Sequence, residues 1–217
     1  MQTTNQEVYM NKNDNELQQF KNNVMEFLKA RHNKGKNGND ESTSRFWLRV
    51  KDSMNDKNNV FYQKIDLGNI GITGHSQGGA GVFTSITIME HKDDYKTAVA
   101  LSPTMEETAI ALGWNYDLSK INIPTLMIAG TKGDFEIKIV IPIEKMIDMY
   151  NKIPSQKVMM RRTGADHGQM LYAADGYVTA WFMWQLQGDE EAAKAFVGDS
   201  PEIMNNSLYQ DQRIDIK

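Results

Sequence analysis

The sequence contains no cysteine. This absence excludes disulfides, thiolate chemistry and zinc sites built on cysteine ligands. It does not decide the compartment, so both a cytoplasmic and a secreted location stay open.

Long apolar runs are also absent. No stretch approaches the roughly 20 apolar residues of a membrane helix. The polar start, "MQTTNQEVYMNKNDN", lacks the apolar core of a signal peptide. We therefore expect a soluble chain with no membrane span. Nothing in the chain has the spacing of metal ligands, and we predict no cofactor.

Positive charge is scattered along the chain and slightly outnumbered by negative charge. The net charge is −4, with 24 Lys and Arg against 28 Asp and Glu. No basic block is interleaved with aromatic residues, so the composition gives no case for a nucleic-acid partner.

The chain is long enough for a sizeable core. Its 217 residues, 40% of them hydrophobic, predict a single domain over residues 1–217. Near the start, apolar residues at helical spacing predict a helix over about 15–31. Residues 33–44 have the composition of a loop, and residues 45–54 fit a short helix or a turn.

From Lys64 onward, short apolar strands alternate with helices. Such alternation predicts an α/β fold with a mostly parallel sheet of four or more strands, flanked by helices. The strands are expected over about 69–74, 97–102, 124–130 and 157–162. The helices are expected over 79–91, 140–152 and 168–188, with a last short one over 189–198. The aromatic stripe Tyr177, Trp181 and Trp184 on the long helix is interpreted as core.

Ser76 stands in Gly74-His75-Ser76-Gln77-Gly78, between a predicted strand and a predicted helix. In that setting a G-x-S-x-G turn lifts a serine hydroxyl clear of the backbone. The following helix directs its N-terminal N–H groups at the same place, where they favour negative charge. We therefore interpret Ser76 as a nucleophile.

A serine nucleophile needs a base. The chain has four histidines. His32 and His91 end helices and are expected to be solvated, and His75 is expected to pack beneath the turn. His167, on the loop after the fourth strand, is the predicted base.

The base needs an orienting acid, which in hydrolases of this architecture comes between the serine and the histidine in the chain. Asp134, just past the third strand, is the predicted acid. Asp166 is a competitor that we interpret as a turn or capping residue, and Glu136 is a third option.

The remaining parts of the site are less fully specified. The N–H of Gln77 is the expected first oxyanion donor, because it follows the nucleophile directly. Residues 1–65 contain no convincing strand and turn to supply a second donor. Ser102 and Pro103, at the end of the second strand, and Met170 are candidate substrate contacts, although a simple strand stop is the alternative for the first two.

The segments "GHSQGGAG", "IPTLMIAGTKGD" and "GADHGQM" resemble the α/β-hydrolase superfamily, in its dienelactone hydrolase-like, chlorophyllase and polyester hydrolase (cutinase-like) branch. The C-terminal "YVTAWFMWQLQGDEEAAKAFVG" is similar to that branch's last helix. The resemblance covers nearly the whole chain but only the C-terminal two-thirds of the family fold. The family's first strands and its oxyanion loop would then be absent, which implies either a fragment or an altered N-terminal part.

Together these features predict a serine esterase that forms an acyl-enzyme on Ser76. The alternative is a truncated, non-catalytic remnant that acts as a binding or interaction module. In either case the strand before Ser76 would be an exposed apolar sheet edge, for which we predict self-association into a homo-oligomer.

Overall fold

The computed structural model describes residues 50–216, and the chain divides into a unit over residues 1–65 and a unit over residues 66–217. The helix predicted over 15–31 and the loop predicted over 33–44 lie outside the described residues. In the first unit, residues 50–55 are helical and are followed by turns, so the described part of the segment predicted as a short helix or a turn is a helix. The prediction of a single domain over 1–217 stays a prediction.

The second unit is built on a five-stranded sheet with the strand order β1-β2-β3-β4-β5. Strands β1 to β4 are parallel, and β5 runs antiparallel to β4. The strands are β1 (Ile70–His75), β2 (Tyr95–Leu101), β3 (Thr125–Gly130), β4 (Lys157–Arg162) and β5 (Tyr209–Asp215). The predicted fold class, a mostly parallel sheet flanked by helices, is confirmed.

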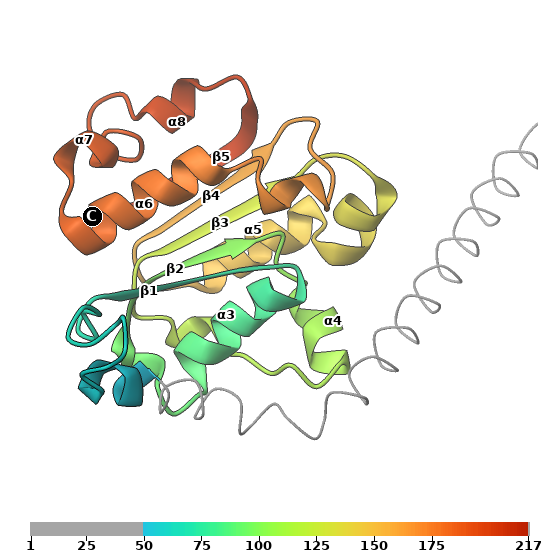
Figure 1. Cartoon of the computed structure of the whole chain (residues 1–217). Helices are drawn as coiled ribbons and strands as arrows, with labels where there is room; N and C mark the ends of the chain where they lie inside the picture. The colour runs from blue at the N-terminus through green and yellow to red at the C-terminus, as the bar shows by residue number, and fades with distance from the viewer. Residues whose placement is uncertain (1–49, 217) are drawn as a thin grey trace, which may run out of the picture. The chain divides into compact units, whose positions relative to one another are not determined.

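Helices fill the connections between the strands. They are α3 (Gln77–Thr87), α4 (Glu106–Ala111), α5 (Ile143–Lys152), α6 (Asp175–Gln187), α7 (Glu190–Ala193) and α8 (Glu202–Asn205). Short 3-10 turns are η1 (Lys92–Asp94), η2 (Leu118–Lys120) and η4 (Gln169–Leu171), and η3 (Phe135–Val140) is a π-helix. Figure 1 shows α6, α7 and α8 on one side of the sheet, with α3 and α4 on the other. Crossovers between parallel strands share one hand, which places α5 on the side of α3.

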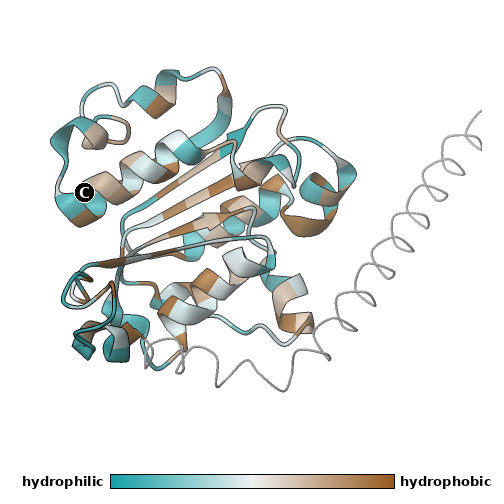
Figure 2. Ribbon diagram, in the orientation of Figure 1, coloured by the Kyte–Doolittle hydropathy of each residue, from teal (hydrophilic) through white to brown (hydrophobic). Residues whose placement is uncertain are grey.

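The central strands are apolar on both faces, as buried parallel strands require. Val99 of β2 and Leu126 of β3 are fully buried in the core on the α6 side. The residues that alternate with them, Ala98 of β2, Met127 of β3 and Met159 of β4, are fully buried as well. Figure 2 shows the same hydrophobic band running through the middle of the sheet. Strand β1 differs, because none of its residues is fully buried and it forms one edge of the described sheet.

The core on the α6 side is closed by aromatic side chains. Trp181 is fully buried, packs edge-on against Phe196 and donates its indole N–H to Thr97 Oγ1 at 2.7 Å. The Thr97 hydroxyl in turn donates to the carbonyl of Pro124 at 2.9 Å. The core interpretation is thus confirmed for Trp181 and for Tyr177, which is also buried.

Several bounds differ from the predictions. The helix predicted over 79–91 is α3, which starts at Gln77 and ends at Thr87. The helix predicted over 168–188 is broken into η4 and α6, and it ends as expected at Gly188, whose φ is 68°. The last predicted helix corresponds to α7, but α8 and β5 follow it. Within residues 50–216 no helix is long and apolar enough to cross a membrane.

The buried Thr97 hydroxyl provides a test of this core. We expect Thr97→Val to lower the free energy of unfolding by about 1–3 kcal/mol, because the Trp181 N–H loses its acceptor in a dry setting. Urea unfolding followed by tryptophan fluorescence measures the change. The exposed Thr73 provides the matched control, since Thr73→Val should change stability by no more than about 0.5 kcal/mol. Equal effects of the two variants would contradict the role of the Thr97 hydroxyl as the buried acceptor of the Trp181 N–H.

Candidate active site

Ser76 occupies a sharp turn between β1 and α3. Its backbone has φ 61° and ψ −119°, a conformation that costs a non-glycine residue energy and is typical of functional turns. The turn is held because Ser76 N–H donates to the Leu101 carbonyl at 2.9 Å and its carbonyl accepts from Ala80 N–H at 3.1 Å. The sharp turn from strand to helix that the sequence predicts at Ser76, called the nucleophile elbow below, is present.

The glycine before the elbow is required by close packing. A Cβ on Gly74 would lie 2.3 Å from the carbonyl oxygen of Gly78, where no side chain fits. Gly74 is therefore required because a side chain there would collide with the backbone of Gly78. At Gly78 itself a side chain would meet no obstacle.

His167 lies on the loop after β4 and faces the serine. Its Nε2 is 2.8 Å from Ser76 Oγ, and its Nδ1 is 2.6 Å from the carboxylate oxygen Oε2 of Glu136. An ionised carboxylate only accepts, so Nδ1 carries the proton and Nε2 accepts from the serine hydroxyl. The structure thus brings Ser76 and His167 together as the sequence predicts.

The partner of His167 is Glu136, and the prediction of Asp134 for that position is wrong. The Asp134 side chain is 68% exposed and forms an ion pair with Lys138 at 2.9 Å. Glu136, which the sequence left as a third option, has a fully buried side chain against His167. Asp166 lies in the turn before η4, where its carboxylate accepts from Gln169 N–H at 3.0 Å, in line with its interpretation as a turn or capping residue.

The π-helix η3 explains why the acid is displaced by two positions. Asp134 precedes η3 on the solvent side, and the buried residues of η3 are Glu136, Ile139 and Val140. Glu136 therefore shares the i, i+3, i+4 spacing of an apolar face. This spacing is visible in the sequence and was the signal that could have identified Glu136.

Three groups hold the Glu136 carboxylate. Besides His167, Ser102 Oγ donates to Oε1 at 2.6 Å and Gly130 N–H donates to it at 2.7 Å. Burial raises the pKa of this carboxyl, but the hydrogen bonds from His167, Ser102 and Gly130 outweigh it, so the pKa lies below its ordinary value. Glu136 is consequently ionised at neutral pH.

Ser102 therefore supports the acid and is not a substrate contact, which corrects the prediction. It is fully buried, its backbone has a φ of 40°, and its hydroxyl donates to Glu136. Pro103 is buried and packs against Gly79, so closely that a Cβ on Gly79 would collide with it. Met170 is fully buried in the core. The predicted substrate contacts Ser102, Pro103 and Met170 are thus all buried in the structure.

Gln77 is the first residue of α3, directly after Ser76. The first N–H groups of a helix have no partner inside it and carry partial positive charge. The N–H of Gln77 is thus available in principle for a negatively charged oxygen beside Ser76. Among the described residues, no group of three or more acidic or histidine side chains is arranged to hold a metal ion.

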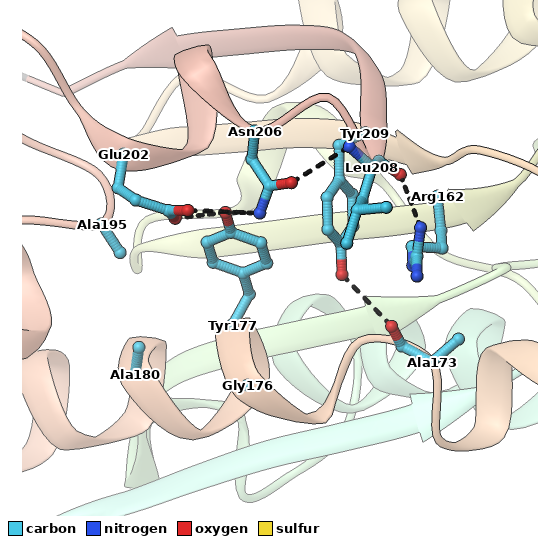
Figure 3. Close-up of a pocket in the computed structure, with 10 residues that line it drawn as sticks. All are labelled: Arg162, Ala173, Gly176, Tyr177, Ala180, Ala195, Glu202, Asn206, Leu208 and Tyr209. Carbon is cyan, nitrogen blue, oxygen red and sulfur yellow. Dashed lines mark hydrogen bonds between the residues drawn. The ribbon is translucent and has the colours of Figure 1, made fainter.

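A pocket of about 400 Å³ lies elsewhere, between α6, α8 and β5 (Figure 3). Its polar groups largely bind one another. The Tyr177 hydroxyl bonds to Glu202 and Asn206, and the Tyr209 hydroxyl donates to the Ala173 carbonyl. None of its lining residues belongs to the Ser76 site, so this pocket is not the place where the serine chemistry would occur.

No family model and no curated protein matches the chain. Solved structures similar to it include a puromycin hydrolase, with 13% identity and a TM-score of 0.45. The matched region is 60% of this chain and 24% of the puromycin hydrolase chain. A dienelactone hydrolase from Anabaena variabilis has 18% identity and a TM-score of 0.43, covering 63% of this chain and 56% of its own. Acetyl xylan esterase 1 from Thermoanaerobacterium sp. has 19% identity and a TM-score of 0.42, covering 63% and 50%.

The chain thus spans about a quarter to a little over half of the length of these proteins. Likenesses at such identities and TM-scores carry no argument about activity. The case for a function rests on the side chains around Ser76.

The pKa of Glu136 provides a test by pH. A carboxyl whose pKa is lower in the folded than in the unfolded protein stabilises the fold. This stabilisation is fully present above the pKa of the unfolded chain, 4.5, and is lost as the pH falls through the pKa of the folded protein. We expect Glu136→Gln to cost on the order of 1–3 kcal/mol of stability at pH 7. The difference in free energy of unfolding between wild type and Glu136→Gln should shrink below pH 4.5. Urea unfolding at pH 7 and at acid pH measures it, and a gap that does not change with pH would refute the account.

Proposed function

We propose that this protein is a serine hydrolase that cleaves carboxylic esters through an acyl-enzyme on Ser76. The observation that supports the proposal is the hydrogen-bonded series from Ser76 Oγ through His167 to the buried Glu136. A serine hydroxyl is a weak nucleophile alone, and a neighbouring imidazole fixed by a carboxylate removes that limitation.

In the proposed reaction His167 Nε2 takes the proton of Ser76 Oγ while the oxygen attacks the ester carbonyl carbon. The tetrahedral oxyanion rests on Gln77 N–H and the N-terminus of α3. When the intermediate collapses, the bond to the alcohol oxygen breaks and His167 returns the proton to it. Water then attacks the acyl-enzyme by the same proton path and releases the acid. Glu136 stabilises the imidazolium in both halves.

Esters fit this site better than amides. An oxyanion site ordinarily has two donors, and removal of one typically costs roughly 10²–10³ in rate. The described residues offer one main-chain donor directly after Ser76, and an ester, with its better leaving group, tolerates weaker oxyanion stabilisation. We therefore expect slow turnover of activated esters.

Hydrolysis of a short p-nitrophenyl ester tests the nucleophile. We expect measurable turnover by the wild-type protein and a loss of roughly four orders of magnitude or more in Ser76→Ala, because that variant removes the attacking oxygen. The release of p-nitrophenol is followed by absorbance. Turnover that persists in Ser76→Ala would refute the proposal.

The acid is tested by a matched pair of variants. Glu136→Gln should reduce kcat by roughly 10⁴-fold, because an amide no longer fixes the imidazole tautomer or stabilises its cation. Asp134→Asn, at an exposed position two residues earlier, should stay within about threefold of wild type, since exposed ion pairs contribute little. The opposite order of effects would restore Asp134 as the acid.

The alternative of a non-catalytic binding module rests on a different feature. Strand β1 forms an edge of the described sheet, with partly buried apolar residues Ile70 and Ile72. Such edges favour pairing with another strand, and self-association through β1 stays a prediction. A stable monomer in size-exclusion chromatography would count against it.

A further inference from the structure

His75, the residue before the nucleophile, contacts the loop that carries His167. Its Nε2 lies 2.8 Å from the main-chain carbonyl oxygen of His167, and the centroids of the two imidazole rings are 4.5 Å apart. The expectation that His75 only packs beneath the turn is therefore incomplete. Neighbouring residues of the elbow thus hold His167 at two points, Ser76 at the ring and His75 at the main chain.

The chemistry of this contact fixes the state of His75. A carbonyl oxygen only accepts hydrogen bonds, so the Nε2 of His75 carries a proton. The pKa of His75 is lowered, first by burial and then by the nearby His167, against the raising effects of the His167 carbonyl and Glu136. His75 is consequently neutral at neutral pH, with its proton on Nε2.

We infer that His75 is a positioning residue, which ties the His167 loop to the nucleophile elbow through its Nε2–H bond to the His167 carbonyl. The inference rests on the proposed function for its catalytic consequence. The bond limits movement of the imidazole relative to Ser76 Oγ, and displacements on the order of 1 Å at such a site can cost about 10²-fold in rate.

Because His75 is neutral, its ring can lie beside His167 without opposing the positive charge that His167 acquires. In the proposed reaction His167 becomes an imidazolium, and a second cation 4.5 Å away would oppose that step. Among the described residues, the ionisable groups that act on His75 are His167 and Glu136. A neutral donor can therefore hold the loop without competing for the charge on Glu136.

Two variants separate the hydrogen bond from the shape of the side chain. His75→Phe keeps a ring but removes the donor, whereas His75→Gln supplies an amide N–H of similar reach. With the p-nitrophenyl ester we expect His75→Phe to lose roughly 10- to 100-fold in kcat with little change in KM. His75→Gln should recover most of kcat. Equal losses in the two variants, or a loss confined to KM, would overturn the assignment.

A second measurement does not depend on catalysis. The chain has four histidines, so a protein labelled with ¹⁵N-histidine gives few imidazole signals, and His75→Gln identifies that of His75. We expect His75 at pH 7.5 as the neutral Nε2–H tautomer, and we expect the His167 signals to shift in His75→Phe but to stay near wild type in His75→Gln. A charged His75, a proton on its Nδ1, or unchanged His167 signals in His75→Phe would overturn the inference.

The two experiments also separate this inference from the proposed function. If the wild-type protein cleaves no ester but the imidazole signals behave as expected, the proposed function fails and the positioning of the loop by His75 stands. If the ester is cleaved and the two His75 variants behave alike in both measurements, the positioning role fails alone.

Discussion

The hydrogen bond between the Glu136 carboxylate and Nδ1 of His167 is the constraint around which this end of the sheet is built. Burying a carboxylate costs free energy unless its oxygens accept hydrogen bonds. Ser102 at the end of β2 and Gly130 at the end of β3 supply those bonds. The histidine loop must also come close, and a Cβ on Gly130 would lie 2.4 Å from the Ala165 carbonyl. The absence of that side chain lets the loop approach.

The parallel sheet explains why residues so distant in the chain meet. The carboxyl ends of β1 to β4 lie along one edge, where ligands bind in open sheets of this kind. Ser76, Ser102 and His167 each follow a different strand there, and Glu136 reaches the same place from η3. The pocket beside α6 and α8 is a separate feature with its own hydrogen bonds.

Apolar patterning in the sequence predicts strands β1 to β4 closely, and β4 has the predicted bounds. Strand β5 escapes prediction because "YQDQRID" is largely polar and exposed, and Asp211 interrupts it with a φ of 58°. The serine and base follow from the turn pattern and from the few histidines. The position after β3 alone does not identify the acid. The apolar spacing of Glu136, Ile139 and Val140 indicates Glu136, whereas Asp134 precedes η3 and does not share that spacing. The contacts of Ser102 and His75 depend on loops brought together only by the fold.

Covalent labelling tests the central claim most directly. A fluorophosphonate reacts rapidly with a serine whose hydroxyl is activated by a base, and peptide mapping by mass spectrometry locates the adduct. The hydrogen bonds that join Ser76 to His167, and His167 to Glu136, predict a single adduct on Ser76 in the wild-type protein, lost in His167→Ala. No adduct on the folded wild-type protein, or an adduct on Ser76 that forms equally fast without His167, would contradict the account.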